Sequence, residues 1–317
     1  MKKYIPILIT MPFFVFLIRL INNDFWYDEY YMLFHKAFNP LKDITTNYNS
    51  VNTHQLMAVW CKFLSVIGGF NITTALDSPD IMRVPQLVLP IVTIIYLWKI
   101  CKKYFNRKIG YLSIAILLTT IPYYYYALQI RGYSLSVMLM TMILYYSWGD
   151  MSGKKPLLLI GLTALFCYTM SSNFFFVVIL IGYLAITKES NFKILSVGCA
   201  LGVVMYTPLL MGMMGDPFVS QQGMFTHSVE TMTGTLWEVI NGFMSYRWFL
   251  PVLALIGYFR GNAIDRKIML CIIMLTVPFL LFALHGGKIY GRFMFPALPC
   301  FCIFLAVGIE NIKGIKQ

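Results

Sequence analysis

The chain has 317 residues, of which 59% are hydrophobic and only 12% are charged, and its mean hydropathy is +0.70. Because so few polar side chains cannot cover a soluble globule of this length, the composition excludes a soluble protein and predicts an all-α polytopic membrane protein. The formal net charge of +12 is explained below by topology and does not indicate nucleic-acid binding.

Apolar segments long enough to cross a hydrocarbon core of ~30 Å recur along nearly the whole chain, and we expect about ten transmembrane helices. In chain order they are Tyr4–Ile21, Asp80–Ile100, Ile109–Ala127, Tyr133–Trp148, Pro156–Met170, Asn173–Thr187, Phe192–Met213, Phe243–Phe259, Ile268–Leu284 and Phe293–Ile309. The first segment has no small-residue cleavage site after it, so we expect it to stay as an anchor.

The spans leave no room for a separate soluble domain, so residues 1–317 are expected to form a single membrane-embedded domain. Residues 1–150 would supply the core spans with a first outer loop at 22–79, and residues 151–317 would supply further spans with an outer loop at 214–242. Within the first loop, the apolar stretch at 54–64 is shorter than a span and is broken by Lys62. This pattern predicts an amphipathic helix in the headgroups, which would either anchor the loop or take part in substrate binding.

The lysines and arginines set the orientation. With a cytoplasmic N-terminus, the inner side receives most of the 25 basic residues, namely Lys2, Lys3, Lys99, Lys102, Lys103, Arg107, Lys108, Lys154, Lys155, Lys188, Lys193, Arg260, Arg266, Lys267, Lys313 and Lys316. The positive-inside rule therefore predicts a protein of the cytoplasmic membrane with both termini in the cytoplasm and the two long loops outside.

Several charged residues remain on the predicted outer side, where topology does not require them. They are Asp28 and Glu29 after the first span, His54 in the first loop, and Arg83, Arg131 and Arg292 near the starts of later spans. Taken singly, each arginine also fits a side chain that snorkels to the headgroups. Uncompensated charge beside the hydrocarbon is expensive, so their common side predicts one shared site.

These residues lie in an ordered pattern that resembles the C-type membrane glycosyltransferases with the GT-C fold, in particular the group similar to protein O-mannosyltransferases and the lipid A aminoarabinose transferase. The resemblance covers most of residues 1–150 and returns at 288–309. It rests on Trp26-Tyr27-Asp28-Glu29, Asn52-Thr53-His54, Arg83-Val84-Pro85, Arg131-Gly132-Tyr133 and the stretch Arg292–Pro299. Two departures bear on the acceptor side: Gln55 follows His54 where the family often has proline, and Gln129 stands where an acidic or small residue is common.

The resemblance implies a polyprenyl-phosphate donor that gives up its hexosyl or pentosyl group to a glycan, lipid or protein acceptor on the outer face. Charge then grows on the lipid phosphate as the glycosidic bond breaks, and the guanidinium forks of Arg131 and Arg292 suit its oxygens. His54, Arg83 and Tyr133 are the further candidates for substrate binding. Asp28 is the candidate general base that takes the proton of the acceptor hydroxyl.

Adjacent carboxylates project about 100° apart on a helix, so Asp28 and Glu29 cannot straddle one anomeric carbon, and a single displacement with inversion is expected. Glu29 is then a catalytic candidate with three open roles: to orient the acceptor, to pair with an arginine, or to bind a divalent cation together with His54. No other cofactor is indicated by the sequence.

Two other functions stay open at this stage. The chain could be a lipid-linked sugar transporter or flippase, or an oligosaccharide ligase or polymerase. The nearly uncharged span interiors argue against passage through the membrane. The outer loop at 214–242, which carries His227, Glu230, Trp237 and Glu238, fits either sugar binding or an ordinary solvated loop. The run Tyr123–Tyr126 fits either an aromatic belt or a sugar platform.

Overall fold

The computed structural model describes residues 5–48, 54–149, 152–214, 233–234, 236–238, 240–241, 247–261, 264–284 and 291–313. Within these ranges every regular element is a helix, which confirms the predicted all-α class. In chain order the helices are α1 (Ile5–Leu20), α2 (Tyr27–Met32), η1 (Leu33–Ala37), α3 (Leu41–Thr46), α4 (Gln55–Gly68), α5 (Ile72–Asp77), α6 (Pro79–Arg83), η2 (Val84–Leu87), α7 (Val88–Tyr104), α8 (Arg107–Leu118), α9 (Ile121–Ala127), α10 (Gly132–Ser147), α11 (Lys155–Thr169), α12 (Asn173–Ile186), α13 (Asn191–Met214), α16 (Phe249–Gly261), α17 (Arg266–Leu284), η3 (Gly291–Ala297) and α18 (Leu298–Lys313).

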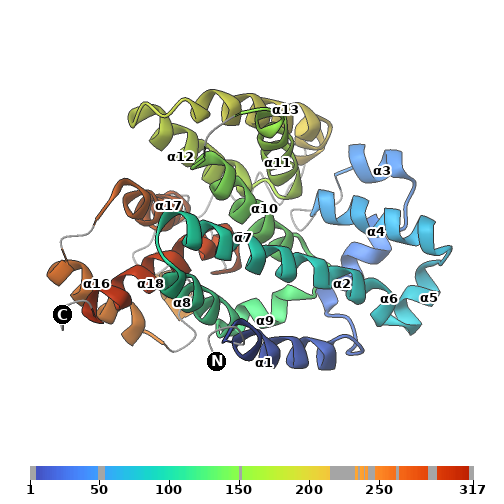
Figure 1. Cartoon of the computed structure of the whole chain (residues 1–317). Helices are drawn as coiled ribbons and strands as arrows, with labels where there is room; N and C mark the ends of the chain where they lie inside the picture. The colour runs from blue at the N-terminus through green and yellow to red at the C-terminus, as the bar shows by residue number, and fades with distance from the viewer. Residues whose placement is uncertain are drawn as a thin grey trace.

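The pair α7 and α10 lies at the centre, with the other helices grouped around it (Figure 1). On one side α8 packs against α7 and α18, and α16 packs on α18; on another, α11 packs against α10 and α13. The short helices α3 to α6 lie together at the right of the view. One hydrophobic core runs through these groups and includes the buried rings of Tyr123, Tyr133 and Phe166.

Three helical segments among the described residues are long and apolar enough to cross a membrane: Pro79–Tyr104, Asn191–Gly212 and Gly291–Ile312. The bent pair α9 and α10 would make a fourth if it counts as one broken span, and five further apolar helices are shorter, with 10–17 residues. The described part of the chain therefore supports three or four spans, and the expected number of about ten is not confirmed.

The predicted span Ile109–Ala127 is the clearest difference from the sequence-based expectation, because it is two helices. Helix α8 ends at Leu118, where the Thr119 and Thr120 hydroxyls donate to the carbonyls of Ala115 and Ile116 at 2.7 and 2.8 Å. Helix α9 then starts with Pro122 in its first turn, a position that needs no N–H donor. A bend of 106° separates α9 from α10, and this bend brings the 128–131 link to the candidate site.

The amphipathic helix predicted in the first loop is observed as α4. Its buried face carries Met57, Ala58 and Cys61, while Phe63, Val66 and Ile67 are exposed apolar residues on the other side. Gly69 ends the helix in the left-handed conformation, at φ 66°. An exposed apolar face suits a helix that lies in the headgroups, and that location stays a prediction.

Helices α16 and α18 approach so closely that only small residues fit between them. A Cβ on Gly257 would lie 1.7 Å from the carbonyl oxygen of Gly308, and a Cβ on Gly308 would lie 2.6 Å from Cα of Ala254. The Tyr258 hydroxyl also donates to the carbonyl of Phe304 at 2.8 Å. Because η3 leads directly into α18, this contact helps to fix the segment that carries Arg292.

We therefore expect Gly308→Ala to lower the thermal unfolding midpoint of the purified protein in detergent, since the added methyl group forces α16 and α18 apart. The matched control is Gly161→Ala on α11, where nothing lies within 4 Å of the position that a Cβ would take. Alanine is favoured over glycine in a helix by about 1 kcal/mol, so the control should be neutral or stabilising. Equal midpoints for the two variants would show that the α16–α18 contact does not hold.

Candidate active site

The adjacent acidic residues Asp28 and Glu29 lie in the first turn of α2, where carboxylates are favoured by the helix dipole. Their side chains point apart. Glu29 is fully buried, and its Oε2 accepts from the backbone N–H of Trp26 at 3.0 Å, in the manner of a capping box. Asp28 is 29% exposed. The structure therefore gives the two neighbours different surroundings, one buried and one at the surface of the site.

Glu29 connects three segments of the chain. Its Oε1 accepts from the backbone N–H of Ile130 at 2.8 Å, and its Oε2 lies 3.1 Å from Nη2 of Arg83. Arg83 in turn donates to the carbonyls of Leu20 and Asp24, each at 3.0 Å. Of the three roles left open by the sequence, the structure shows pairing with an arginine. The pair ties the α1–α2 turn to α6 and to the α9–α10 link.

Arg131, at the N-cap of α10, is the centre of a second cluster and is only 2% exposed. Its Nη1 donates to Oδ2 of Asp28, and its Nε and Nη2 lie 3.2 and 3.1 Å from Nε2 of His54. Its guanidinium carbon lies 5.0 Å from the ring centroid of Tyr133. The fork is therefore held on one side by an ion pair and on another by an imidazole and an aromatic face.

Burial, together with the positive charges of Arg131 and Arg292, lowers the pKa of His54 well below its ordinary value. The ring is therefore neutral at pH 7. A neutral ring with a lone pair on Nε2 accepts from Arg131 and adds no further positive charge to the cluster.

Arg292 reaches the same cluster from the other end of the chain. It lies on η3, with Nη1 3.7 Å from Oδ2 of Asp28 and its guanidinium carbon 5.9 Å from the ring centroid of Tyr133. Its side chain is 20% exposed. Asp28 thus lies between two guanidinium groups. The structure brings the seven residues predicted from the sequence into two clusters, one around Glu29 and one around Asp28. The two clusters are connected because Asp28 and Glu29 are neighbours in the chain.

Arg292 also lines a cavity of about 310 Å³ next to this cluster. The other residues around the cavity are Pro122, Tyr126, Trp237, Glu238, Asn241, Gly291 and Phe295. Trp237 and Glu238 come from the segment 214–242 that the sequence predicts to be an outer loop, and both are helical, whereas His227 and Glu230 lie outside the described residues. Aromatic faces beside polar groups suit a sugar ring, so this cavity is the candidate substrate pocket.

Sequence reasoning did not assign a role to Asn241 or Phe295. Phe295 packs edge-on against Tyr126, with ring centroids 5.1 Å apart, and it follows Arg292 in the same motif. Asn241 lies about one helical turn beyond Trp237, and nothing in the sequence singled it out.

The geometry does not favour Glu29 and His54 as a shared cation site. No group of three or more histidine, cysteine or acidic side chains that could hold a metal lies in the part of the chain that the structure describes. Both Glu29 oxygens receive N–H donors, and Nε2 of His54 faces the Arg131 guanidinium.

Comparison with known proteins agrees with this architecture. A family model described as dolichyl-phosphate-mannose-protein mannosyltransferase matches residues 69–212, which is less than half of the chain and includes Arg83, Arg131 and Tyr133. No curated protein matches the sequence.

Two crystal structures of ArnT from Cupriavidus metallidurans share the fold. The apo structure has a TM-score of 0.65 at 13% identity over 98% of this chain and 60% of that chain. The structure bound to undecaprenyl phosphate has a TM-score of 0.63 at 12% identity, over 98% and 62%. The chain thus spans about 60% of the length of the structures it matches. These matches confirm the fold that the resemblance implies, and the family match supports the resemblance over residues 69–212.

The buried pair predicts a large effect of removing one charge. Glu29→Gln leaves Arg83 buried without its counter-ion, so we expect the free energy of unfolding to fall by about 3–5 kcal/mol. The same substitution at Glu310, which lies 3.3 Å from a Lys108 side chain that is 78% exposed, should cost less than about 1 kcal/mol. Denaturant unfolding of both variants in detergent makes the comparison, and a similar small loss for both would contradict the buried-pair interpretation.

Proposed function

We propose that this protein is an inverting glycosyltransferase that moves a sugar from a polyprenyl-phosphate carrier to an acceptor hydroxyl on the outer face of the membrane. The observation that carries the proposal is the position of Asp28 between Arg131 and Arg292, beside a cavity with aromatic walls. The ArnT fold supports it, since one of the two matched structures holds undecaprenyl phosphate. So does the family match, whose description names a dolichyl-phosphate sugar.

The donor phosphate would bind the two arginines. The named side chains of the two clusters comprise three guanidinium groups, of Arg83, Arg131 and Arg292, and two carboxylates, so the neutral His54 leaves them one positive charge in excess. A phosphate diester carries one negative charge and gains a second as the glycosidic bond breaks. Charge-assisted hydrogen bonds from the two forks therefore strengthen as the leaving group forms.

Asp28 would accept the proton of the acceptor hydroxyl. While the site holds no phosphate, the Asp28 carboxylate is the anion that the two arginines share. A bound phosphate offers the guanidinium groups a second anion, and the carboxylate is then released to take a proton. Donor binding would in this way prepare the base, and acceptor attack would follow it.

The structure also bears on stereochemistry. A double displacement needs a second carboxylate on the opposite face of the sugar. Glu29 is fully buried and holds Trp26, Ile130 and Arg83, so it is not available for that role. A single displacement by the acceptor oxygen, with loss of its proton to Asp28 and departure of the lipid phosphate, supports inversion at the anomeric carbon.

The first test of this mechanism is Asp28→Asn, which keeps the shape of the side chain and removes the base. We expect transfer of radiolabelled sugar from synthetic polyprenyl-phosphate donors to fall by about 10²–10⁴-fold, with donor binding retained. Asp24→Asn, at an exposed position four residues earlier in the chain, is the matched control and should transfer at the wild-type rate.

Monodispersity in detergent serves as the folding check for both variants. An Asp28→Asn protein that transfers sugar at a near wild-type rate would contradict the proposed role of Asp28 as the general base. If neither the wild type nor the control transfers sugar, but both move the labelled donor across a liposome membrane, the lipid-linked sugar transporter is favoured instead.

A second test concerns the phosphate contact. Arg292→Lys keeps the positive charge and loses the planar fork, so we expect kcat/KM for the donor to fall by about 10- to 100-fold, which corresponds to about 1.5–3 kcal/mol. Arg266→Lys is the matched control, because Arg266 is 76% exposed and lies 3.9 Å from Glu189. Unchanged donor kinetics in Arg292→Lys would show that this arginine has a structural role and does not bind the donor phosphate through its planar fork.

A further inference from the structure

The four consecutive tyrosines of α9 lie in four different surroundings. Tyr123 is fully buried, and its ring stacks on that of Phe13 in α1 with centroids 5.8 Å apart. Tyr124 also packs on Phe13, with centroids 5.0 Å apart. Tyr125 is 47% exposed. Of the four, only Tyr126 lines the cavity of about 310 Å³ beside the candidate active site.

The helical period explains why one tyrosine of the run reaches the cavity. Pro122 and Tyr126 are four residues apart and therefore share a face of α9, and both line the cavity. Tyr123 and Ala127 share another face, which is fully buried. The break before α9 and the bend of 106° after it thus turn the Pro122 face of this short helix toward the cavity.

The ring of Tyr126 is both fixed in place and accessible. It packs edge-on against the rings of Tyr133 and Phe295, with centroids 5.0 and 5.1 Å apart and interplanar angles of 71° and 70°. Its side chain is partly exposed. Of the other aromatic residues that line the cavity in the described part of the chain, Phe295 is only 3% exposed and Trp237 is 66% exposed. Phe295 therefore offers little surface to a ligand, whereas Tyr126 offers an oriented one.

Tyr133 connects Tyr126 with the two arginines of the site. The guanidinium carbons of Arg131 and Arg292 lie 5.0 and 5.9 Å from the ring centroid of Tyr133, and the ring of Tyr126 is packed directly against that of Tyr133. The Tyr126 side chain also interacts with that of Arg292. A sugar bonded to a phosphate is its immediate neighbour, and Tyr126 adjoins the arginines in the same way.

We propose that the ring of Tyr126 is the platform on which the donor sugar stacks, so that α9 binds the sugar while Arg131 and Arg292 bind the phosphate. The ligand is taken to be a polyprenyl-phosphate sugar, so this assignment rests on the proposed function. The C–H groups on one face of a sugar ring form an apolar surface that an aromatic ring covers well. Asn241, which also lines the cavity, offers polar atoms to the hydroxyl groups of the sugar.

The test separates the sugar from the phosphate by a ratio of two affinities. Purified full-length protein in detergent is titrated with undecaprenyl phosphate and with undecaprenyl-phosphate mannose, glucose, galactose or N-acetylglucosamine, and the dissociation constants are measured by microscale thermophoresis. The sugar increment is the Kd of the bare carrier divided by the Kd of the sugar-bearing lipid that the wild type binds best. We expect Tyr126→Leu to lower this increment by about tenfold.

Tyr126→Phe keeps the ring and should retain the sugar increment. Loss of the hydroxyl contact with Arg292 changes both dissociation constants in common, and the ratio cancels that change. The matched control is Tyr125→Leu, which alters a neighbouring ring of the same run that does not line the cavity, and we expect it to leave both constants unchanged. The thermal unfolding midpoint of each variant checks folding.

Several outcomes would overturn the role of Tyr126. They are a folded Tyr126→Leu protein with the wild-type increment, a Tyr126→Phe protein that loses the increment, and a wild type for which no sugar adds affinity. A loss in Trp237→Leu without a loss in Tyr126→Leu would assign the platform to Trp237 instead. In all of these cases the bare carrier still binds. A wild type that does not bind undecaprenyl phosphate would contradict the proposed function itself, and this assignment with it.

Discussion

The buried Glu29 carboxylate fixes the geometry on which the candidate active site depends. It receives the N–H groups of Trp26 and Ile130 and the guanidinium of Arg83. Glu29 follows Asp28 in the chain and Ile130 precedes Arg131, so this one carboxylate sets how close the two ionic partners come. Reactions that depend on positioning slow down when such contacts shift by about 1 Å. A positioning role is therefore one reason for a carboxylate to be buried and charged here.

The convergence of charged residues could be predicted from the sequence because charge beside a membrane needs a partner. Asp28, Arg131 and Arg292 each follow or open an apolar segment, and their common side was enough to predict a shared site. The contact between Glu29 and Ile130 could not be predicted, because every residue except proline has a backbone N–H and the sequence does not show which one a carboxylate will bind. Asn241 was missed for a related reason: its neighbours Trp237 and Glu238 have side chains that suit sugar binding, and a single asparagine is too common to indicate a site.

For the fold, the sequence predicted the structural class but not the positions of the helix ends. Apolar composition predicted an all-α chain, but it does not report where a helix ends. The segment Ile109–Ala127 is apolar enough on average to predict one span, yet the threonine hydroxyls at 119 and 120 and the proline at 122 divide it. Pro122 was visible in the sequence, and proline in a membrane helix is often tolerated, so it did not by itself predict a break.

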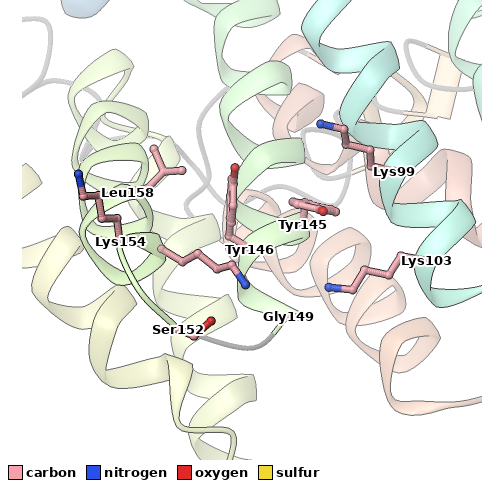
Figure 2. A pocket seen from close by; sticks show the side chains of 9 residues that line it. Lys99, Lys103, Tyr145, Tyr146, Gly149, Ser152, Lys154 and Leu158 are labelled. Carbon is pink, nitrogen blue, oxygen red and sulfur yellow. The ribbon is translucent and has the colours of Figure 1, made fainter.

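The two ends of the α7–α10 pair treat positive charge in different ways. At the Asp28 end the cations are arginines, and the protein supplies a carboxylate that holds their planar forks in one geometry. At the other end the cations are the exposed lysines Lys99 and Lys103 (Figure 2), each of which lies beside a tyrosine ring. A guanidinium fork recognises a phosphate by shape, whereas an ammonium group recognises it as a point charge. The first arrangement suits a reaction in which one phosphate must be placed against one sugar carbon, and the second sets no such fixed geometry.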